Sequence, residues 1–102
     1  MLQQYIGRKV IVRSDASGVH FGEVTAVSET WVTLKNSRRL FEWHTGGSGI
    51  SLSEVAVCGI DQSRSRITMT LPEITVFGMC EIIPAEGMAI ATIEGAAVAT
   101  PS

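Results

Sequence analysis

Apolar and polar residues alternate along much of the N-terminal half, which is the period-two pattern of β-strands. Residues 9–13 are rich in β-branched side chains and form the first predicted strand, and residues 19–27 form the second. Between them, residues 14–18 have the serine, aspartate and glycine content of a turn. The alternation of the second strand changes phase at Gly22, so we expect a β-bulge that bends the strand there.

The third predicted strand covers residues 31–35, with Val32 and Leu34 on its inner face and Trp31 outside the core. A polar Asn-Ser pair then interrupts the pattern, and residues 38–43 continue as extended chain. An outward-facing tryptophan on so small a domain indicates a contact surface, because large exposed apolar patches are uncommon on monomers.

Helical spacing replaces the alternation after a glycine-rich loop at residues 45–49. Ser51 and Glu54 form a capping-box pattern, and apolar residues then recur every three or four positions. The pattern therefore predicts a short amphipathic helix that ends near Gly59.

The C-terminal part returns to strand-like patterns. Residues 66–71 form the fourth predicted strand, followed by a tight turn at residues 72–73. Residues 74–83 form a long fifth strand with a kink at Gly78. Residues 85–97 fit either a weak helix or an irregular tail that packs on a neighbour.

These elements predict a mainly β fold: a small, five-stranded, partly open barrel with one short helix after the third strand and a C-terminal helix or tail. The barrel is expected to be SH3-like, and an OB-like barrel, which also has five strands and a helix between strands three and four, is the alternative. We expect one domain over residues 1–95 and a tail over residues 96–102, because about 100 residues is the usual size of a single core.

Composition narrows the classes of function. Hydrophobic residues make up 45% of the chain and charged residues 18%, which excludes intrinsic disorder. The formal net charge of −2 argues against general nucleic-acid binding. We expect no membrane association, because no run approaches the ~20 apolar residues of a membrane span and the N-terminus lacks the pattern of a secretory signal. All eight basic side chains lie in residues 1–66, so we expect a small cationic patch on the first half.

The strongest candidate for a ligand site begins in the extended segment before the glycine loop and ends at the helix start. An arginine can fork onto a phosphate, an aromatic ring can stack on a base, and glycine amides with a helix N-terminus can hold an anion. The candidate ligand-binding residues are Arg38, Arg39, Phe41, Trp43, His44, Gly47, Ser48 and Ser51. The alternative is that the glycines form only a flexible turn, while Phe41 and Trp43 pack against the helix or a second subunit.

No pattern of catalytic or metal-ligating residues stands out. The chain contains no Cys-x-x-Cys, His-x-x-x-His or Gly-x-Ser-x-Gly, so we expect neither an enzyme nor a metal site, and no cofactor. Cys58 and Cys80 lie in apolar segments and are expected to be buried, reduced thiols of a cytosolic protein. A disulfide between them remains the alternative.

Five segments of the chain resemble, taken together, a family of small uncharacterised proteins encoded by tailed bacteriophages and prophages. These segments are residues 5–13, 18–22, 32–40, 51–56 and 81–85. The resemblance implies a phage origin and a location in the cytoplasm of the bacterial host. It carries no catalytic signature with it.

We therefore expect an oligomeric, non-enzymatic binding protein. The leading hypothesis is a sponge that sequesters a phosphorylated nucleotide, of cyclic nucleotide or ADP-ribose type, which signals in host anti-phage defence. The first alternative is a virion structural, decoration or assembly protein, and the second is an inhibitor that binds a host protein.

Overall fold

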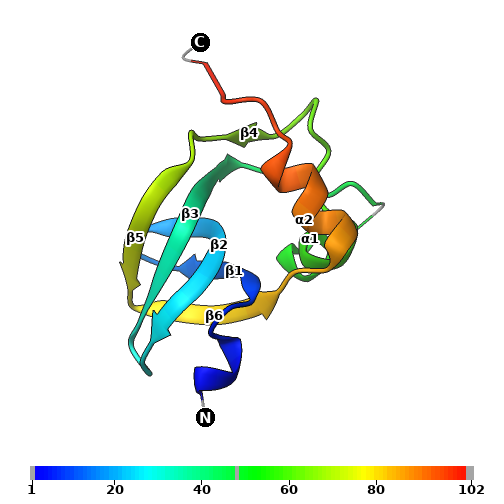
Figure 1. Ribbon diagram of the computed structural model, residues 1–102. Helices are drawn as coiled ribbons and strands as arrows, with labels where there is room; N and C mark the ends of the chain where they lie inside the picture. The colour runs from blue at the N-terminus through cyan, green and yellow to red at the C-terminus, as the bar shows by residue number, and fades with distance from the viewer. Residues whose placement is uncertain (1, 48, 101–102) are drawn as a thin grey trace.

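The computed structural model describes residues 2–47 and 49–100, which form a mainly β domain with short helices (Figure 1). The described residues contain six strands instead of the five expected. The strands are β1 (Lys9–Ser14), β2 (Gly18–Val27), β3 (Trp31–Glu42), β4 (Arg66–Ile67), β5 (Leu71–Phe77) and β6 (Met79–Pro84). The helices are the 3-10 helix η1 (Leu2–Tyr5) and the α-helices α1 (Leu52–Cys58) and α2 (Gly87–Glu94).

All six strands belong to one antiparallel sheet. The order of neighbours is β6, β1, β2 and β3, and both β5 and β4 pair with β3, along its first and second half respectively. Strands β5 and β6 follow one another through Gly78 but pair at opposite ends of the sheet. The sheet therefore curls, as Figure 1 shows, but stays open, because no ladder joins β5 to β6 among the described residues.

The core lies on both faces of β1. Ile11 packs in a cluster with Phe21 of β2 and with the buried faces of α1 and α2. Val10 and Val12 pack in a second cluster with residues of β2, β3 and β5. Three successive β-branched residues are what a strand covered on both faces requires, since neighbouring side chains point to opposite faces.

A bulge is present beside Gly22, but its extra residue belongs to β3 and not, as expected, to β2, because Phe21 and Glu23 pair with Arg38 and Lys35, which are three positions apart. The pairing of β2 with β3 shifts register between Phe21 and Glu23, on either side of this glycine. A Cβ atom at Gly22 would lie 2.9 Å from the Cβ atom of Leu34, so the two strands can approach this closely only where one side chain is absent.

The interruption expected after residue 35 is wrong. Strand β3 continues through residues 36 and 37 but forms a bulge there, in which Asn36 takes a left-handed backbone conformation, with φ 51°, that asparagine tolerates better than most residues. The expected inward orientation of Val32 and Leu34 is confirmed, since both side chains are fully buried. Trp31, which was expected to lie outside the core, is half-buried.

The boundaries of the later strands differ from the sequence-based expectation. The strand expected over residues 66–71 is reduced to β4, and the turn expected at residues 72–73 is wrong, because both residues belong to β5. Proline is tolerated there because, within residues 2–47 and 49–100, β5 pairs with β3 alone and needs no amide on its other edge. The kink at Gly78, with φ 67°, is confirmed, and it divides the expected fifth strand into β5 and β6.

The helix expected after the glycine loop is confirmed as α1. The hydroxyl of Ser51 accepts a hydrogen bond from the backbone amide of Glu54 at 3.3 Å, and the helix ends at Gly59 in a left-handed conformation. Of the two alternatives for residues 85–97, the helix is observed as α2. After it, the chain runs beside β4 as far as residue 100, and the last residues of the expected tail, 101 and 102, lie outside the described part.

Both cysteines are free thiols. Their expected burial is wrong, since Cys58 is half-buried and Cys80 is exposed. Strand β6, which carries Cys80, lies at one end of the sheet and is covered less completely than β1.

Candidate functional site

The sequence-predicted site residues do not form one site. The structure distributes them over three places: the interior beside α2, the glycine loop before α1, and the outer face of β3.

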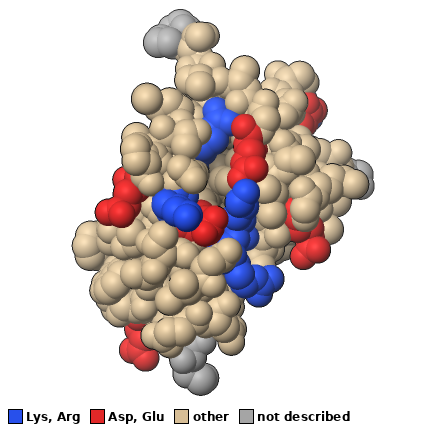
Figure 2. Space-filling view, viewed as in Figure 1, with Lys and Arg blue, Asp and Glu red and all other residues tan. Residues whose placement is uncertain are grey.

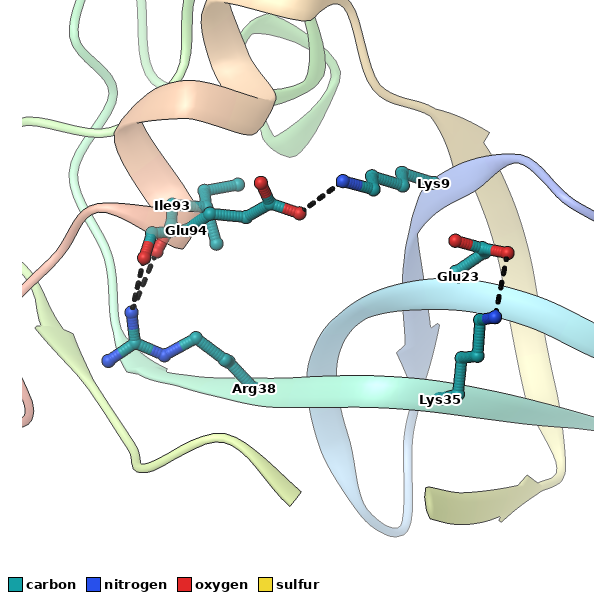
Figure 3. Close-up of polar contacts among 6 residues, drawn as sticks. All are labelled: Lys9, Glu23, Lys35, Arg38, Ile93 and Glu94. Carbon is teal, nitrogen blue, oxygen red and sulfur yellow. Dashed lines mark hydrogen bonds and ion pairs between the residues drawn. The ribbon is translucent and has the colours of Figure 1, made fainter. Parts of the chain in front are cut away.

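Arg38 lies in the interior, with 4% of its surface exposed. Its Nε donates to the Thr68 carbonyl at 2.8 Å, and its Nη1 donates to the carbonyls of Ile93 and Ala96 at 2.9 and 2.7 Å. Figure 3 shows the guanidinium reaching the C-terminal end of α2, where the helix dipole favours a cation. Burial lowers the pKa of Arg38. We therefore assign Arg38 a structural role and leave it out of the candidate site.

The glycine loop contains a carboxylate of the chain itself. A Cβ atom at Gly47 would lie 2.8 Å from Oε2 of Glu54, and one at Gly49 would overlap Oε1 of the same side chain. The hydroxyl of Thr45 donates to Oε1 at 3.1 Å. The loop needs glycine because Glu54 lies against it, and its negative charge disfavours a phosphate at this point. Ser51 caps α1, and Ser48 lies outside the described residues.

Trp43, His44 and Gly47 do come together, in a cavity of about 420 Å³ that Arg64 also lines. The Nε2 atom of His44 lies 3.6 Å from a carboxylate oxygen of Glu42. Because the negatively charged side chains of Glu42 and Glu54 lie close by, this cavity is poorly suited to binding an anion.

Arg39 and Phe41 lie on the outer face of β3 and are both exposed. Arg39 lines a cavity of about 260 Å³ with six other residues: His20, Ser37, Thr68, Met69, Leu71 and Ile74. Phe41 lines a neighbouring hollow of about 360 Å³, which shares Thr68 and Met69 with the first. The guanidinium of Arg66 lies over the Phe41 ring, 5.4 Å from its centroid. We call these two adjoining hollows the outer groove.

His20 and Ser37 supply buried polar atoms to the inner end of the outer groove. Each residue is 1% exposed. The His20 Nε2 lies 3.0 Å from the carbonyl of Ser17, a contact that requires the proton on Nε2 and leaves a lone pair on Nδ1. Neither Nδ1 of His20 nor Oγ of Ser37 has a hydrogen-bond partner within the described residues. Buried polar atoms are nearly always paired, so these two unpaired atoms, on residues that both line the cavity, make its inner end a candidate place for a polar ligand.

The charge state of the imidazole follows from its surroundings. Burial and the nearby Arg39 guanidinium lower the pKa of His20 below its ordinary value of 6.5, although the hydrogen bond to Ser17 acts in the opposite direction. His20 is therefore neutral at pH 7. Arg39 forms no side-chain hydrogen bond or ion pair with the described residues, so its guanidinium is available at the mouth of the groove.

The model of one family, a domain of unknown function named DUF6948, matches residues 7–93. The chain belongs to the DUF6948 family. No curated protein and no solved structure matches the chain. The part of the chain matched as a DUF6948 domain includes His20, Ser37 and Arg39 and ends one residue before the end of α2.

Sequence reasoning about this DUF6948 domain missed His20 and Ser37. Strand pairing places His20 opposite Arg39, and Ser37 opposite Leu71 of β5. No local pattern signals either pairing, because each joins residues 19 or more positions apart. The register of the first pair depends on the bulge, and that of the second on where β5 lies. The signal that the sequence did offer was a histidine within the predicted strand at residues 19–27.

The face of the DUF6948 domain drawn in Figure 2 shows basic and acidic side chains beside one another. Two ion pairs, Lys9 with Glu94 and Lys35 with Glu23, belong to the region drawn in Figure 3. In residues 2–47 and 49–100, no helix has the length and apolar character to cross a membrane. Nor does that part of the chain bring three or more His, Cys, Asp or Glu side chains together as a metal site.

Proposed function

We propose that this DUF6948 protein is a phage-encoded, non-enzymatic binding protein that sequesters a small phosphorylated molecule of nucleotide type in the outer groove. The observation that carries the proposal is the pair of buried, unpartnered polar atoms of His20 and Ser37 beneath the unpaired guanidinium of Arg39.

Three groups of the outer groove have roles in this proposal. Arg39 forms charge-assisted hydrogen bonds with the phosphate. The Phe41 ring and the Arg66 guanidinium stacked on it offer a flat surface for a base. The apolar side chains of Met69 and Leu71 line the space between these two ends and offer a contact for the carbon skeleton of the ligand.

Binding is favoured over catalysis by the state of the Ser37 hydroxyl. A serine nucleophile needs a general base within hydrogen-bond distance, and Ser37 Oγ makes no hydrogen bond to His20 or to any other described residue. The groove thus offers recognition groups without an activated nucleophile.

The biological setting rests on the resemblance to phage proteins. A phage protein in the host cytoplasm that holds a phosphorylated nucleotide would lower the concentration of a host defence signal of that chemistry. We also propose that the protein forms a homo-oligomer. We further propose that the curled sheet is SH3-like, because its strands follow one another in a simple antiparallel order with β6 beside β1.

Thermal denaturation with a panel of cyclic nucleotides, ADP-ribose and nucleoside monophosphates tests the function. A true ligand at 100 times its Kd stabilises the fold by about 2.7 kcal/mol and raises Tm measurably. Arg39→Gln should weaken binding by about tenfold or more, since it removes a charge-assisted contact. Arg13→Gln is the matched control, because it removes an exposed arginine outside the groove that pairs with Glu81. A panel without any Tm shift would contradict the proposal.

The alternative as a virion protein predicts a different result. The exposed apolar residues Phe77 and Met88, which lie outside the outer groove, would suit permanent contacts in a particle. Mass spectrometry of purified virions would then find many copies of the chain, whereas the binding function predicts that it is found only in infected cells.

A further inference from the structure

We infer that the outer groove selects phosphate monoesters that carry sugar hydroxyls, such as ribose phosphates, over bare phosphate and over alkyl phosphates. This inference rests on the proposed function, and it concerns the inner end of the same groove, where His20 and Ser37 lie.

The His20 imidazole sets the first requirement. Its Nε2 proton is used by the Ser17 carbonyl, so Nδ1 presents only a lone pair. The unprotonated oxygens of a phosphate monoester dianion also present only lone pairs and cannot satisfy this atom. A hydroxyl can, because it donates a proton. The buried Nδ1 atom therefore favours a ligand with a hydroxyl and disfavours a bare anion at this position.

The Ser37 hydroxyl completes the match. It can donate to a ligand oxygen as well as accept, so a hydroxyl or two neighbouring hydroxyls can donate to His20 and accept from Ser37. The remaining hydroxyl of the cavity is occupied. The Thr68 Oγ1 accepts from the Arg39 backbone amide at 2.9 Å and lies 3.3 Å from the Met69 carbonyl, to which it donates.

The position of Arg39 places the phosphate end of the ligand. His20 and Arg39 are cross-strand partners on β2 and β3, so the guanidinium and the imidazole are neighbours on one face. His20 is buried whereas Arg39 is exposed. The hydroxyls therefore enter the groove first and the phosphate remains at its mouth. The remaining lining residues, Met69, Leu71 and Ile74, are apolar and suit the carbon skeleton of the ligand.

Isothermal titration of the full chain with two matched probes tests this selection. Ribose 5-phosphate carries the hydroxyls, and cyclopentylmethyl phosphate keeps a five-membered ring and the phosphate but lacks them. We expect ribose 5-phosphate to bind about tenfold more tightly, because the analogue leaves buried polar atoms unpaired. Inorganic phosphate should bind more weakly than either.

Two variants assign the preference to the named atoms. His20→Gln keeps an amide donor for the Ser17 carbonyl but replaces the imidazole acceptor with an amide oxygen in a different position, and Ser37→Ala removes the other group. Each should reduce the preference for ribose 5-phosphate to about threefold or less. Ser17→Ala is the control, since Ser17 Oγ is also buried and unpartnered but lies outside the cavity. Circular dichroism establishes that each variant is folded, and Ser37→Ala keeps the test decisive if His20→Gln does not fold.

The outcomes separate the two proposals. If both probes bind wild type equally, or if Ser37→Ala leaves the preference unchanged, the inference about hydroxyls is overturned while the binding function stands. If neither probe binds and the nucleotide panel also gives no Tm shift, the proposed function fails and the inference fails with it.

Discussion

Arg38 shows at the scale of one residue how an apparent ligand group becomes a structural one. In the sequence it stands beside Arg39, and both arginines fit a phosphate site equally well. In the structure Arg38 points inward and binds the end of α2, whereas Arg39 points outward into the groove. Alternation along a strand separates the two faces, but it does not tell which face α2 covers.

Arg38→Met tests this structural role. The change should lower the free energy of unfolding by about 2–4 kcal/mol, because it removes charge-assisted hydrogen bonds to the carbonyls of Thr68, Ile93 and Ala96. Arg39→Met, at an exposed position, should change stability by less than about 0.5 kcal/mol. Urea denaturation measures both values. Equal effects of the two variants would contradict the assignment of Arg38 to the interior.

At the scale of elements, single glycines decide where strands end and bend. Gly22 permits the close approach of β2 and β3, and Gly78 turns the chain from β5 into β6. Both effects were predictable, because glycine breaks a strand pattern visibly. The division between β4 and β5 was not predictable from residues 66–71, since the alternation there continues without any break.

Gly78→Ala and Gly87→Ala form a matched pair. A Cβ atom meets nothing within 4 Å at either position, so the two differ in backbone conformation alone. Gly78 has φ 67°, which costs an alanine about 1–2 kcal/mol of stability. Gly87 begins α2 and is outside the left-handed region, so alanine there should stabilise the fold by about 0.4–1 kcal/mol. Thermal unfolding of both variants checks the opposite signs, and a loss of stability in Gly87→Ala would contradict this account.

At the scale of the whole molecule, the open sheet leaves three strands, β4, β5 and β6, that each pair with one neighbouring strand among the described residues. In the described residues β5 pairs with β3 alone, and it carries the exposed apolar side chains of Leu71 and Phe77. An exposed, apolar edge strand is a template for pairing with another copy. A chain of 102 residues also gains from association, because its own core is small.

We expect the protein to form a dimer or larger oligomer through this edge. Phe77→Glu should shift the mass to that of a monomer, because it places a charge where the two copies meet. Val57→Glu, at a similarly exposed apolar position on α1, should leave the assembly intact. Light scattering after size exclusion measures the mass. A monomeric wild type over a wide range of concentrations would contradict the proposed oligomer.

The sequence by itself determined the mainly β class, the kink at Gly78 and the capped helix α1. These features depend on neighbouring residues: alternating side chains, a glycine within a strand, and a serine three positions before a glutamate. Tertiary structure decided the burial of Arg38, the place of Pro72 in a strand and the meeting of His20, Ser37 and Arg39. The physical reason is that strand register and helix coverage arise from contacts between distant parts of the chain, and no local pattern encodes them.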